Sequence, residues 1–136
     1  MDTFFALEIF STFFLTGLIW TVQLVHYPSF LFVADSNYKS FQTFHMRKIT
    51  YIVAPMMLLE LLLSAMNLYR YQSESFVIGF IIVSLIWINT ILWNIPLHKK
   101  LLQKKELPII RKLIVANWPR TILWTLKSLL LLYFLR

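Results

Sequence analysis

Cysteine is absent from this sequence, and charged residues are scarce. Without a single cysteine in 136 residues, disulfides, thiolate metal sites and cysteine nucleophiles are excluded, while the redox compartment stays undetermined. Asp, Glu, Lys and Arg make up only 14% of the chain, whereas 59% is hydrophobic and 17% is aromatic. One soluble core of this size would leave much apolar surface in water, so the composition favours an integral membrane protein over a disordered or water-soluble chain.

Four apolar runs account for nearly the whole sequence. They cover residues 3–27, 45–69, 76–95 and 113–135, and each has the length of about 20 residues that a membrane crossing needs. The first run is too long for the apolar region of a signal peptide, and no basic residue precedes it. We therefore predict an all-α, polytopic membrane protein whose residues 1–136 form one four-transmembrane-helix bundle, with no separate soluble domain.

Prolines and short polar segments mark the expected ends of these runs. Pro28 is expected to stop or kink the first run, and residues 29–44 then read as an aromatic-rich connection at the membrane interface. A polar turn over residues 71–75 separates the second and third runs, and Pro96 closes the third. Pro55 lies inside the second run, which a membrane helix tolerates when neighbours satisfy the freed carbonyl.

Basic residues are distributed unevenly between the two ends of the expected bundle. Cytoplasmic connections of membrane proteins accumulate Lys and Arg. Here the first and third connections and their flanking turns hold Lys39, Arg47, Lys48, Lys99, Lys100, Lys104, Lys105, Arg111, Lys112 and Arg120, whereas the other end holds Arg70 and Arg136. The net charge of +7 is thus interpreted as a topology signal and not as a nucleic-acid surface. We expect a bacterial inner-membrane protein with both termini outside the cytoplasm.

All three histidines fall on the same side of this topology. His26 ends the first run, His45 begins the second and His98 follows the third, so each lies near the cytoplasmic boundary. The start of the fourth helix adds Asn117 and Arg120 at the same level. These groups can ligate, donate hydrogen bonds or exchange protons, which predicts a polar pocket that opens toward the cytoplasm.

Polar and aromatic residues also recur at helical spacing on every run, with Leu, Ile, Val and Phe opposite. The stripes are Glu8, Thr12, Thr16, Trp20, Gln23 and Tyr27; His45, Met56, Glu60, Ser64 and Asn67; Trp87, Thr90, Asn94 and His98; and Asn117, Thr121, Trp124 and Ser128. Such stripes predict a bundle with a polar interior. The alternative is that the Ser, Thr and Asn side chains only join helices through hydrogen bonds.

Two charged residues lie deep inside the expected spans. At about 1.5 Å per residue, Lys127 lies about 15 Å inward from Asn117, which matches the midplane depth expected of Glu60. A buried charge without a partner costs at least ~2.5–3.5 kcal/mol. We therefore expect a midplane Glu60–Lys127 ion pair or a protonated Glu60. A proton relay through Glu60 is the functional alternative to a purely structural pair.

Three interpretations of the histidine layer stay open. His26, His45 and His98 could hold a transition metal or provide axial ligands to a haem, although the chain has neither paired short histidine spacing nor an E-x-x-H pattern. A histidine could instead act as the base on a lipophilic substrate, with Arg120 or Asn117 stabilising the anion. In the third interpretation the histidines bind lipid headgroups or backbone carbonyls.

Several motifs, quoted in chain order, resemble a known family. They are Gly17-Leu-Ile-Trp20-Thr-Val-Gln23-Leu-Val-His26-Tyr27-Pro28, His45 with Pro55-Met56 and Glu60, Pro96-Leu-His98, and Asn117-Trp118-Pro119-Arg120-Thr121. Together they resemble the small four-helix integral membrane proteins related to anthrone oxygenases. The resemblance implies a four-helix bundle and cofactor-independent oxygenation of a polycyclic phenolic substrate, and Asn117 and Arg120 are similar to the family's late Asn-x-x-Arg element.

The preferred prediction is an oxidoreductase or oxygenase that acts on a hydrophobic aromatic or quinone-like small molecule. In this prediction His26, His45 or His98 removes a proton, and Asn117 and Arg120 stabilise the resulting anion. The expected substrate contacts are Trp20, Gln23, Asn94, Trp118 and Trp124. The cofactor is left open between none and a haem or transition metal held by the histidines.

Two further classes of function remain as alternatives. A small proton-coupled transporter subunit would use Glu60 and Lys127, and would need to form a homo-oligomer to enclose a path. A membrane assembly protein would instead use its polar stripes to bind the helices of a partner. Under all three hypotheses the lipid bilayer is the surrounding medium.

Overall fold

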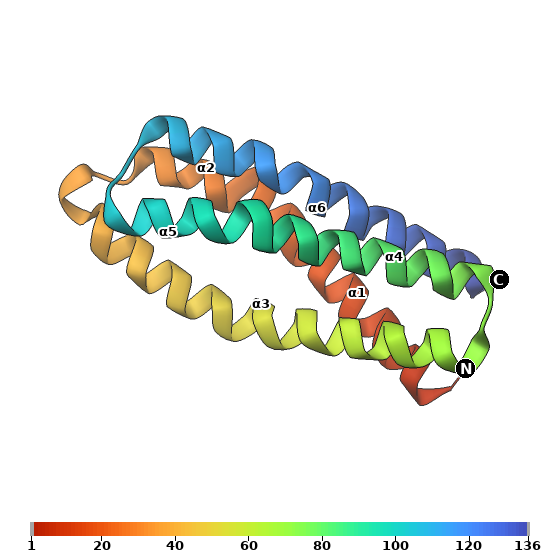
Figure 1. Ribbon diagram of the computed structural model, residues 1–136. Coiled ribbons are helices and arrows are strands. Elements are labelled where there is room, and N and C mark those ends of the chain that lie inside the picture. Colours follow the sequence, from red (N-terminus) through yellow and green to blue (C-terminus); the bar gives the residue numbers. More distant parts are fainter. Residues whose placement is uncertain (1, 136) are drawn as a thin grey trace.

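The computed structural model describes residues 2–135, which form four helical rods that run up and down in sequence (Figure 1). Their helices are α1 (Thr3–Thr21), η1 (Val22–His26), α2 (Tyr27–Ser29) and η2 (Phe30–Phe32) in the first rod; α3 (Asp35–Tyr71) in the second; α4 (Glu74–Asn89), η3 (Thr90–Asn94) and α5 (Ile95–Gln103) in the third; and α6 (Leu107–Phe134) in the fourth. Both chain ends lie at the same end of the bundle (Figure 1).

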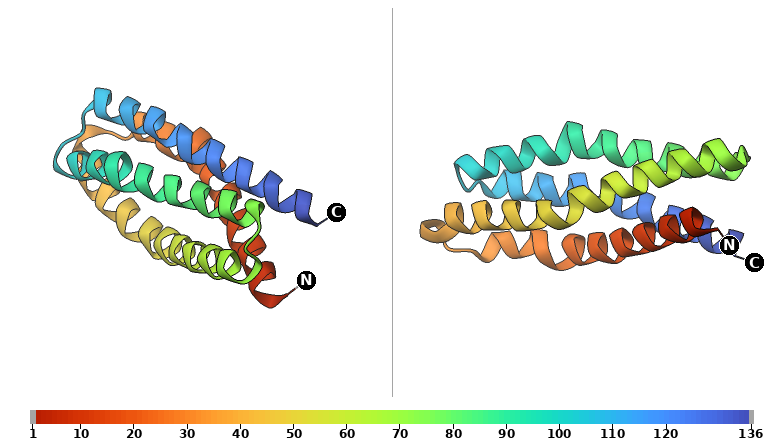
Figure 2. Two further views of the ribbon diagram at one scale, coloured as in Figure 1. Left: turned by 45° about the vertical axis from the view of Figure 1, so that its right-hand side comes forward. Right: turned by 90° about the horizontal axis from the view of Figure 1, so that it is seen from below.

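The rods pack as the sides of a square. α1 contacts α3 and α6, and α4 contacts the same two helices from the opposite side. α5 continues the contacts of the third rod with α3 and α6 at the far end (Figure 2). Each rod therefore turns one face toward a shared interior, and within residues 2–135 no strand interrupts this all-helical arrangement.

Local sequence explains the helix ends near the termini. The carboxylate of Asp2 accepts a hydrogen bond from the Phe4 backbone N–H at 3.0 Å and thereby caps α1. This N–H bond, with further contributions from Tyr71 and Arg70, lowers the pKa of the Asp2 carboxyl. At the end of α3, Gln72 adopts a left-handed φ of 46°, and its N–H donates to the Leu68 carbonyl.

The outer surface of the bundle is apolar and its interior is polar, the reverse of a water-soluble protein. Many large hydrophobic residues are exposed, and Phe10, Leu62, Ile81 and Leu129 are at least 50% exposed. Three rods, Thr3–Phe32, Asp35–Tyr71 and Glu74–Gln103, are long and apolar enough to cross a membrane. α6 is interrupted by the basic residues Arg111, Lys112, Arg120 and Lys127. These features fit an integral membrane protein.

The expected polar stripes face the interior almost throughout. Their buried members are Glu8, Thr12, Gln23, Tyr27, His45, Glu60, Ser64, Asn67, Asn94, His98, Asn117, Thr121, Trp124 and Ser128. Trp20 is the clear exception, because its side chain is 37% exposed on the outside of the bundle. The helical spacing in the sequence therefore identifies the inward face of each rod.

Two prolines do not end their rods, which corrects the expected boundaries. Each follows a π-helical turn: Pro28 lies two residues after η1, and Pro96 two residues after η3. Proline cannot donate a backbone hydrogen bond and clashes with the carbonyl four residues earlier, and the wider π turn accommodates that defect. The first rod consequently continues to Phe32, and the third continues past Pro96 to Gln103.

The expected connection over residues 29–44 is also wrong in most of its length. Only Val33 and Ala34 separate η2 from α3, which begins at Asp35 and not at about His45. Similarly, α6 begins at Leu107 and not at about Leu113, with Pro108 in its first turn. The rods are longer than the predicted spans at the basic end of the bundle.

Candidate functional site

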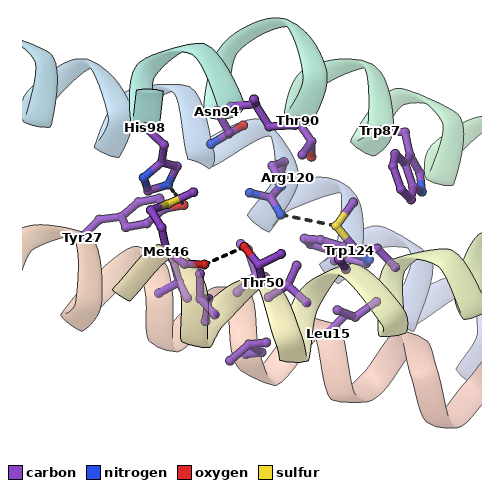
Figure 3. Close-up of a pocket in the computed structure, with 18 residues that line it drawn as sticks. Leu15, Tyr27, Met46, Thr50, Trp87, Thr90, Asn94, His98, Arg120 and Trp124 are labelled. Atoms are coloured by element: carbon purple, nitrogen blue, oxygen red, sulfur yellow. Dashed lines mark hydrogen bonds between the residues drawn. The ribbon is translucent and has the colours of Figure 1, made fainter. Parts of the chain in front are cut away.

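A cavity of about 190 Å³ lies inside the bundle, between α1, α3, the third rod and α6 (Figure 3). Its lining is mostly apolar and includes Leu15, Ile19, Met57, Trp87 and Trp124. Of the polar side chains, Tyr27 and His98 lie at one end, opposite Leu15 and Trp87, and Arg120 lies between the two ends (Figure 3). A ligand that fits this cavity must therefore combine an apolar body with a polar group.

The mouth of the cavity lies on the flank of the bundle. Thr50 and Ala54 of α3 and Ile95 of α5 line the cavity and are themselves exposed. Next to them, Tyr51, Ile52, Ile91 and Leu92 are large exposed apolar residues on the same two rods. The opening thus lies between α3 and the third rod, on a surface of lipid-like character.

Arg120 is the most unusual residue of the lining. Its side chain is 5% exposed, and among residues 2–135 no carboxylate pairs with it. Nη1 donates to Asn117 Oδ1 at 3.2 Å, Nη2 approaches Met57 Sδ at 3.7 Å, and Nε has no hydrogen-bond partner. In Figure 3 the guanidinium projects from α6 into the space between His98 and Trp124. A buried guanidinium without a counter-charge is costly, so this group is suited to receive an anion.

His98 is the one predicted histidine in the cavity lining, and both its ring nitrogens have partners. Nε2 lies 2.9 Å from the Tyr27 hydroxyl, and Nδ1 lies 3.0 Å from Gln42 Nε2. The amide of Gln42 can present either its N–H₂ or its oxygen to Nδ1, and its Oε1 is otherwise unpartnered. The proton shared in the Tyr27–His98 hydrogen bond can therefore lie on the tyrosine oxygen or on His98 Nε2.

His26 and His45 form a separate pair beside the cavity. His26 Nε2 lies 2.6 Å from His45 Nδ1, and Phe30 packs against both rings with centroid distances of 5.6 and 5.0 Å. The His45 ring centroid is 5.8 Å from that of His98. The structure thus brings the three predicted histidines together, but His26 and His45 do not line the cavity.

The arrangement of these residues does not fit a transition metal or a haem. No group of three or more His, Asp or Glu side chains in residues 2–135 could hold a metal ion. Both His98 nitrogens are engaged, and the facing nitrogens of His26 and His45 are hydrogen-bonded to each other. Pockets for drug-sized ligands have volumes of about 300–1,000 Å³. The cavity, at about 190 Å³, is smaller than these.

Buried amides form a layer behind the cavity. Asn117 Nδ2 donates to Gln23 Oε1 at 2.9 Å, and Gln23 Nε2 donates to the Ile114 carbonyl at 3.1 Å. Asn89 Nδ2 donates to Asn94 Oδ1 at 2.8 Å, so Asn94 belongs both to this network and to the cavity lining. Gln23 and Asn117, expected at the site, act from behind it, where Asn117 holds the Arg120 guanidinium.

Two of the three expected ring contacts lie elsewhere. Trp20 and Trp118 are 37% and 38% exposed and pack edge to face with a centroid distance of 5.9 Å. They form a pair on the outside of α1 and α6, where each follows a buried residue, Ile19 and Asn117. Trp124 does line the cavity, and the Arg120 guanidinium lies 5.1 Å from its ring centroid.

The expected Glu60–Lys127 ion pair is present, within a larger cluster. Lys127 Nζ lies 3.1 Å from Glu60 Oε1 and 3.0 Å from Glu8 Oε1. Trp124 Nε1 donates to Glu60 Oε2 at 2.9 Å, so one tryptophan contacts both the cavity and the cluster. Glu8 is the only formally charged residue of the first apolar run. The spacing of residues along one helix does not reveal its partner on another helix.

Tyr27 and Gln42 are site residues that the sequence prediction missed. Tyr27 lies on the inward stripe of the first rod next to His26, and that position was its signal. Gln42 was hidden by the assignment of residues 29–44 to a connection. Its spacing from Tyr38 and His45, four and three residues, places all three on one helical face, and all three are buried.

Comparison with known proteins finds no match: no protein-family model, curated protein sequence or solved structure is significantly similar to the chain. The resemblance to anthrone oxygenases remains a prediction from the sequence motifs. Function is therefore argued from the geometry of the cavity.

Proposed function

We propose that this protein takes a lipophilic, ring-containing acid such as a phenol or an enol from the bilayer and accepts its acidic proton. The observation that carries the proposal is Arg120, a buried guanidinium in an apolar cavity with no carboxylate partner in residues 2–135. The anion of a bound acid supplies the missing counter-charge. Trp87 Nε1, an unpartnered donor at the other end of the lining from His98 (Figure 3), is available to a second polar group of the ligand.

In this proposal His98 is the base and Tyr27 its proton partner. His98 lines the cavity and is hydrogen-bonded to the Tyr27 hydroxyl, whereas His26 and His45 lie beside the cavity, which supports choosing His98 among the three. The ligand hydroxyl gives its proton to the Tyr27 oxygen as the Tyr27 O–H proton passes to His98 Nε2, and the resulting anion is held by Arg120. Gln42 and Asn117 position His98 and Arg120.

The size and mouth of the cavity favour a single ring whose remainder stays in lipid. A cavity of about 150 Å³ is enough to bind benzene. The cavity of about 190 Å³ in this protein therefore suits one substituted ring. Trp87 and Trp124 offer flat surfaces for it. The opening between α3 and the third rod lets a tail extend into the bilayer.

We further propose that the anion is the species oxidised, with dioxygen as co-substrate. This step rests on the resemblance to anthrone oxygenases and on the residues that hold the anion. Uptake of dioxygen by the purified protein with a lipophilic phenol or anthrone, measured with an oxygen electrode, tests it. Turnover lost in Arg120→Met supports the step; proton transfer without any dioxygen uptake removes it and leaves the binding proposal intact.

The proposed setting is the bacterial inner membrane, with α6 as a fourth crossing and both termini outside the cytoplasm. Two observations support it: the chain ends lie at one end of the bundle, and the basic residues of the turns lie at the other (Figure 1). Arg120 and Lys127 are buried in the bundle, so they do not face lipid where α6 crosses.

The chromogenic acid 4-nitrophenol tests the proposal in detergent, at a pH below the point at which the free probe ionises. We expect the bound probe to show the visible absorption of the phenolate, because Arg120 stabilises the anion and His98 takes the proton. Arg120→Met should weaken binding about 10- to 100-fold, as expected for the loss of ~1.5–3 kcal/mol from a charged hydrogen bond.

Matched controls separate the anion site from simple apolar binding. 4-Nitroanisole has no acidic proton and should bind wild type and Arg120→Met with similar affinity. Trp118→Phe, on the outer surface, should leave the phenolate spectrum unchanged. A bound probe that stays protonated in the wild type, or a phenolate spectrum retained in both Arg120→Met and His98→Ala, contradicts the proposal.

A proton-coupled carrier subunit is the second candidate. The buried cluster of Glu8, Glu60 and Lys127 favours it, because intramembrane ionisable groups commonly serve proton pathways. A carrier produces proton-coupled flux in sealed vesicles that Glu60→Gln changes, whereas the acid-binding site works equally well in detergent.

A further inference from the structure

The cluster around Lys127 contains more negative than positive groups. Its ammonium lies between the carboxyls of Glu8 and Glu60, at 3.0 and 3.1 Å, and all three side chains are at most 2% exposed. Two ionised carboxylates and one ammonium leave one negative charge uncompensated. An uncompensated charge in this buried position is costly, which favours the binding of one more positive charge.

No other described side chain supplies that charge. The cluster is formed by α1, α3 and α6, and the neighbouring helix α4 has a single charged residue, Glu74, exposed at its first position. At the same end of the bundle, Arg70 is paired with Asp2. Arg120, on α6, lies on the far side of Trp124 at the cavity. The compensating charge is therefore a bound proton or another small cation.

Hydrogen bonds distinguish the two carboxyls. Glu60 has three donors: Thr12 Oγ1 at 2.8 Å and Lys127 Nζ at 3.1 Å on one oxygen, and Trp124 Nε1 at 2.9 Å on the other. Such a set favours the ionised form. Glu60 is therefore the carboxylate of the ion pair, and Glu8 is left to carry the excess.

The contact of Glu8 with Asn67 fits a protonated acid. Glu8 Oε2 and the Asn67 amide are 2.6 Å apart, a distance within the range of O–H···O hydrogen bonds and shorter than is usual for N–H···O. Asn67 is fully buried, yet its Oδ1 has no partner. As placed, Asn67 Nδ2 donates to Glu8 Oε2 and, at 3.4 Å, to the Phe4 carbonyl. With the amide oxygen and nitrogen exchanged, a Glu8 O–H donates to Oδ1 at the cost of the Phe4 contact.

We infer that Glu8, Glu60 and Lys127 form a proton-binding site in the bundle core, in which Glu8 holds one proton while Glu60 and Lys127 are ionised. The site is distinct from the cavity and shares only Trp124 with it. Glu8 lies about 7.5 Å along the axis from Thr3, the first residue of α1. Its proton therefore exchanges with the water on the side of the membrane where the termini lie.

Infrared spectroscopy of the protein in lipid vesicles at neutral pH tests this inference. The wild type should show the carbonyl band of one protonated carboxylic acid, shifted when the solvent is D₂O. Glu8→Gln should lose it, and Glu60→Gln should lose it as well, because Glu8 then becomes the sole carboxylate beside Lys127. Glu8→Asp should keep the band at a changed frequency, which identifies the residue that holds the proton.

Two controls and three contrary results complete the test. Glu74→Gln removes an exposed carboxyl and should leave the band unchanged. Lys127→Met should raise the band to two equivalents, since both carboxyls then lose their ammonium. A wild type without the band, or a band retained in Glu8→Gln, overturns the inference; a band that develops only when sodium is withdrawn assigns the site to a metal cation and overturns it too.

Discussion

At the scale of single residues, Trp124 connects the two polar sites of the interior. Its ring lines the cavity, and its indole N–H donates to Glu60. Because that carboxylate is buried, the donor contributes more than an exposed hydrogen bond does. Substitution with phenylalanine separates the contribution of the ring from that of the N–H, because it keeps an aromatic surface and removes the donor.

Trp124→Phe should lower the free energy of unfolding by about 1–3 kcal/mol, because Glu60 Oε2 loses its only described donor. Titration with SDS in mixed micelles, followed by circular dichroism, measures this change. Trp118→Phe is the matched control on the outer surface and should change stability by less than about 0.5 kcal/mol. Equal effects of the two substitutions would show that the buried hydrogen bond contributes nothing.

The sequence predicts which residues face the interior where they follow a helical stripe. His98, Asn94, Trp124, Asn117 and Arg120 are buried, as the stripes and motifs indicated. Contacts between helices are different, because spacing along one helix does not say which residue of another helix it meets. The pairing of His26 with His45, and that of Glu8 with Lys127, therefore required the structure.

At the scale of helices, the two π turns explain why sequence signals misplaced the ends of the rods. Pro28 and Pro96 are ordinary stop signals, but η1 and η3 absorb them and the rods continue. These turns also carry site residues, since His26 belongs to η1 and Asn94 to η3. Widened turns of this kind cannot be recognised from proline positions alone.

The start of α3 is the sharpest difference between the expected and the observed elements, and proline substitution tests it. Lys39→Pro should destabilise the protein by about 3 kcal/mol, because Lys39 lies inside α3 where its N–H donates to an earlier carbonyl. The same SDS titration measures the effect, and the phenolate spectrum should weaken because Gln42 no longer holds His98.

Two controls accompany this substitution. Ser36→Pro falls in the first turn of α3, where proline is tolerated, and should have little effect. Lys39→Ala reports the loss of the charge alone. If Lys39→Pro were as stable as Lys39→Ala, residues 35–44 would be a connection after all.

At the scale of the whole molecule, the apolar outside and polar inside describe a bundle built for lipid. The composition already indicated this arrangement, because 59% hydrophobic residues cannot be hidden in a core of this size. In the proposed function, the cavity mouth on the flank gives the same surface a second role, as the route by which a lipophilic ligand reaches Arg120. Neither the mouth nor the cavity volume could be predicted, since both depend on how the rods pack.

The absence of cysteine provides a clean background for testing the topology. Ser73→Cys places a thiol in the turn at the end that holds the termini, and Gln103→Cys places one at the opposite end. In intact bacterial cells an impermeant maleimide should label the first variant, and should label the second only after permeabilisation. Labelling of both from one side, or the reverse pattern, would contradict the proposed orientation.

Arg120 is proposed to receive the anion of a lipophilic acid inside the bundle. A structure of the protein in lipid with bound 4-nitrophenol tests it most directly. We expect the phenolate oxygen within hydrogen-bond distance of the Arg120 guanidinium and near His98, with the ring against Trp124 and the distal end toward the mouth between α3 and the third rod. A probe bound elsewhere, or one whose oxygen points away from Arg120, would contradict it.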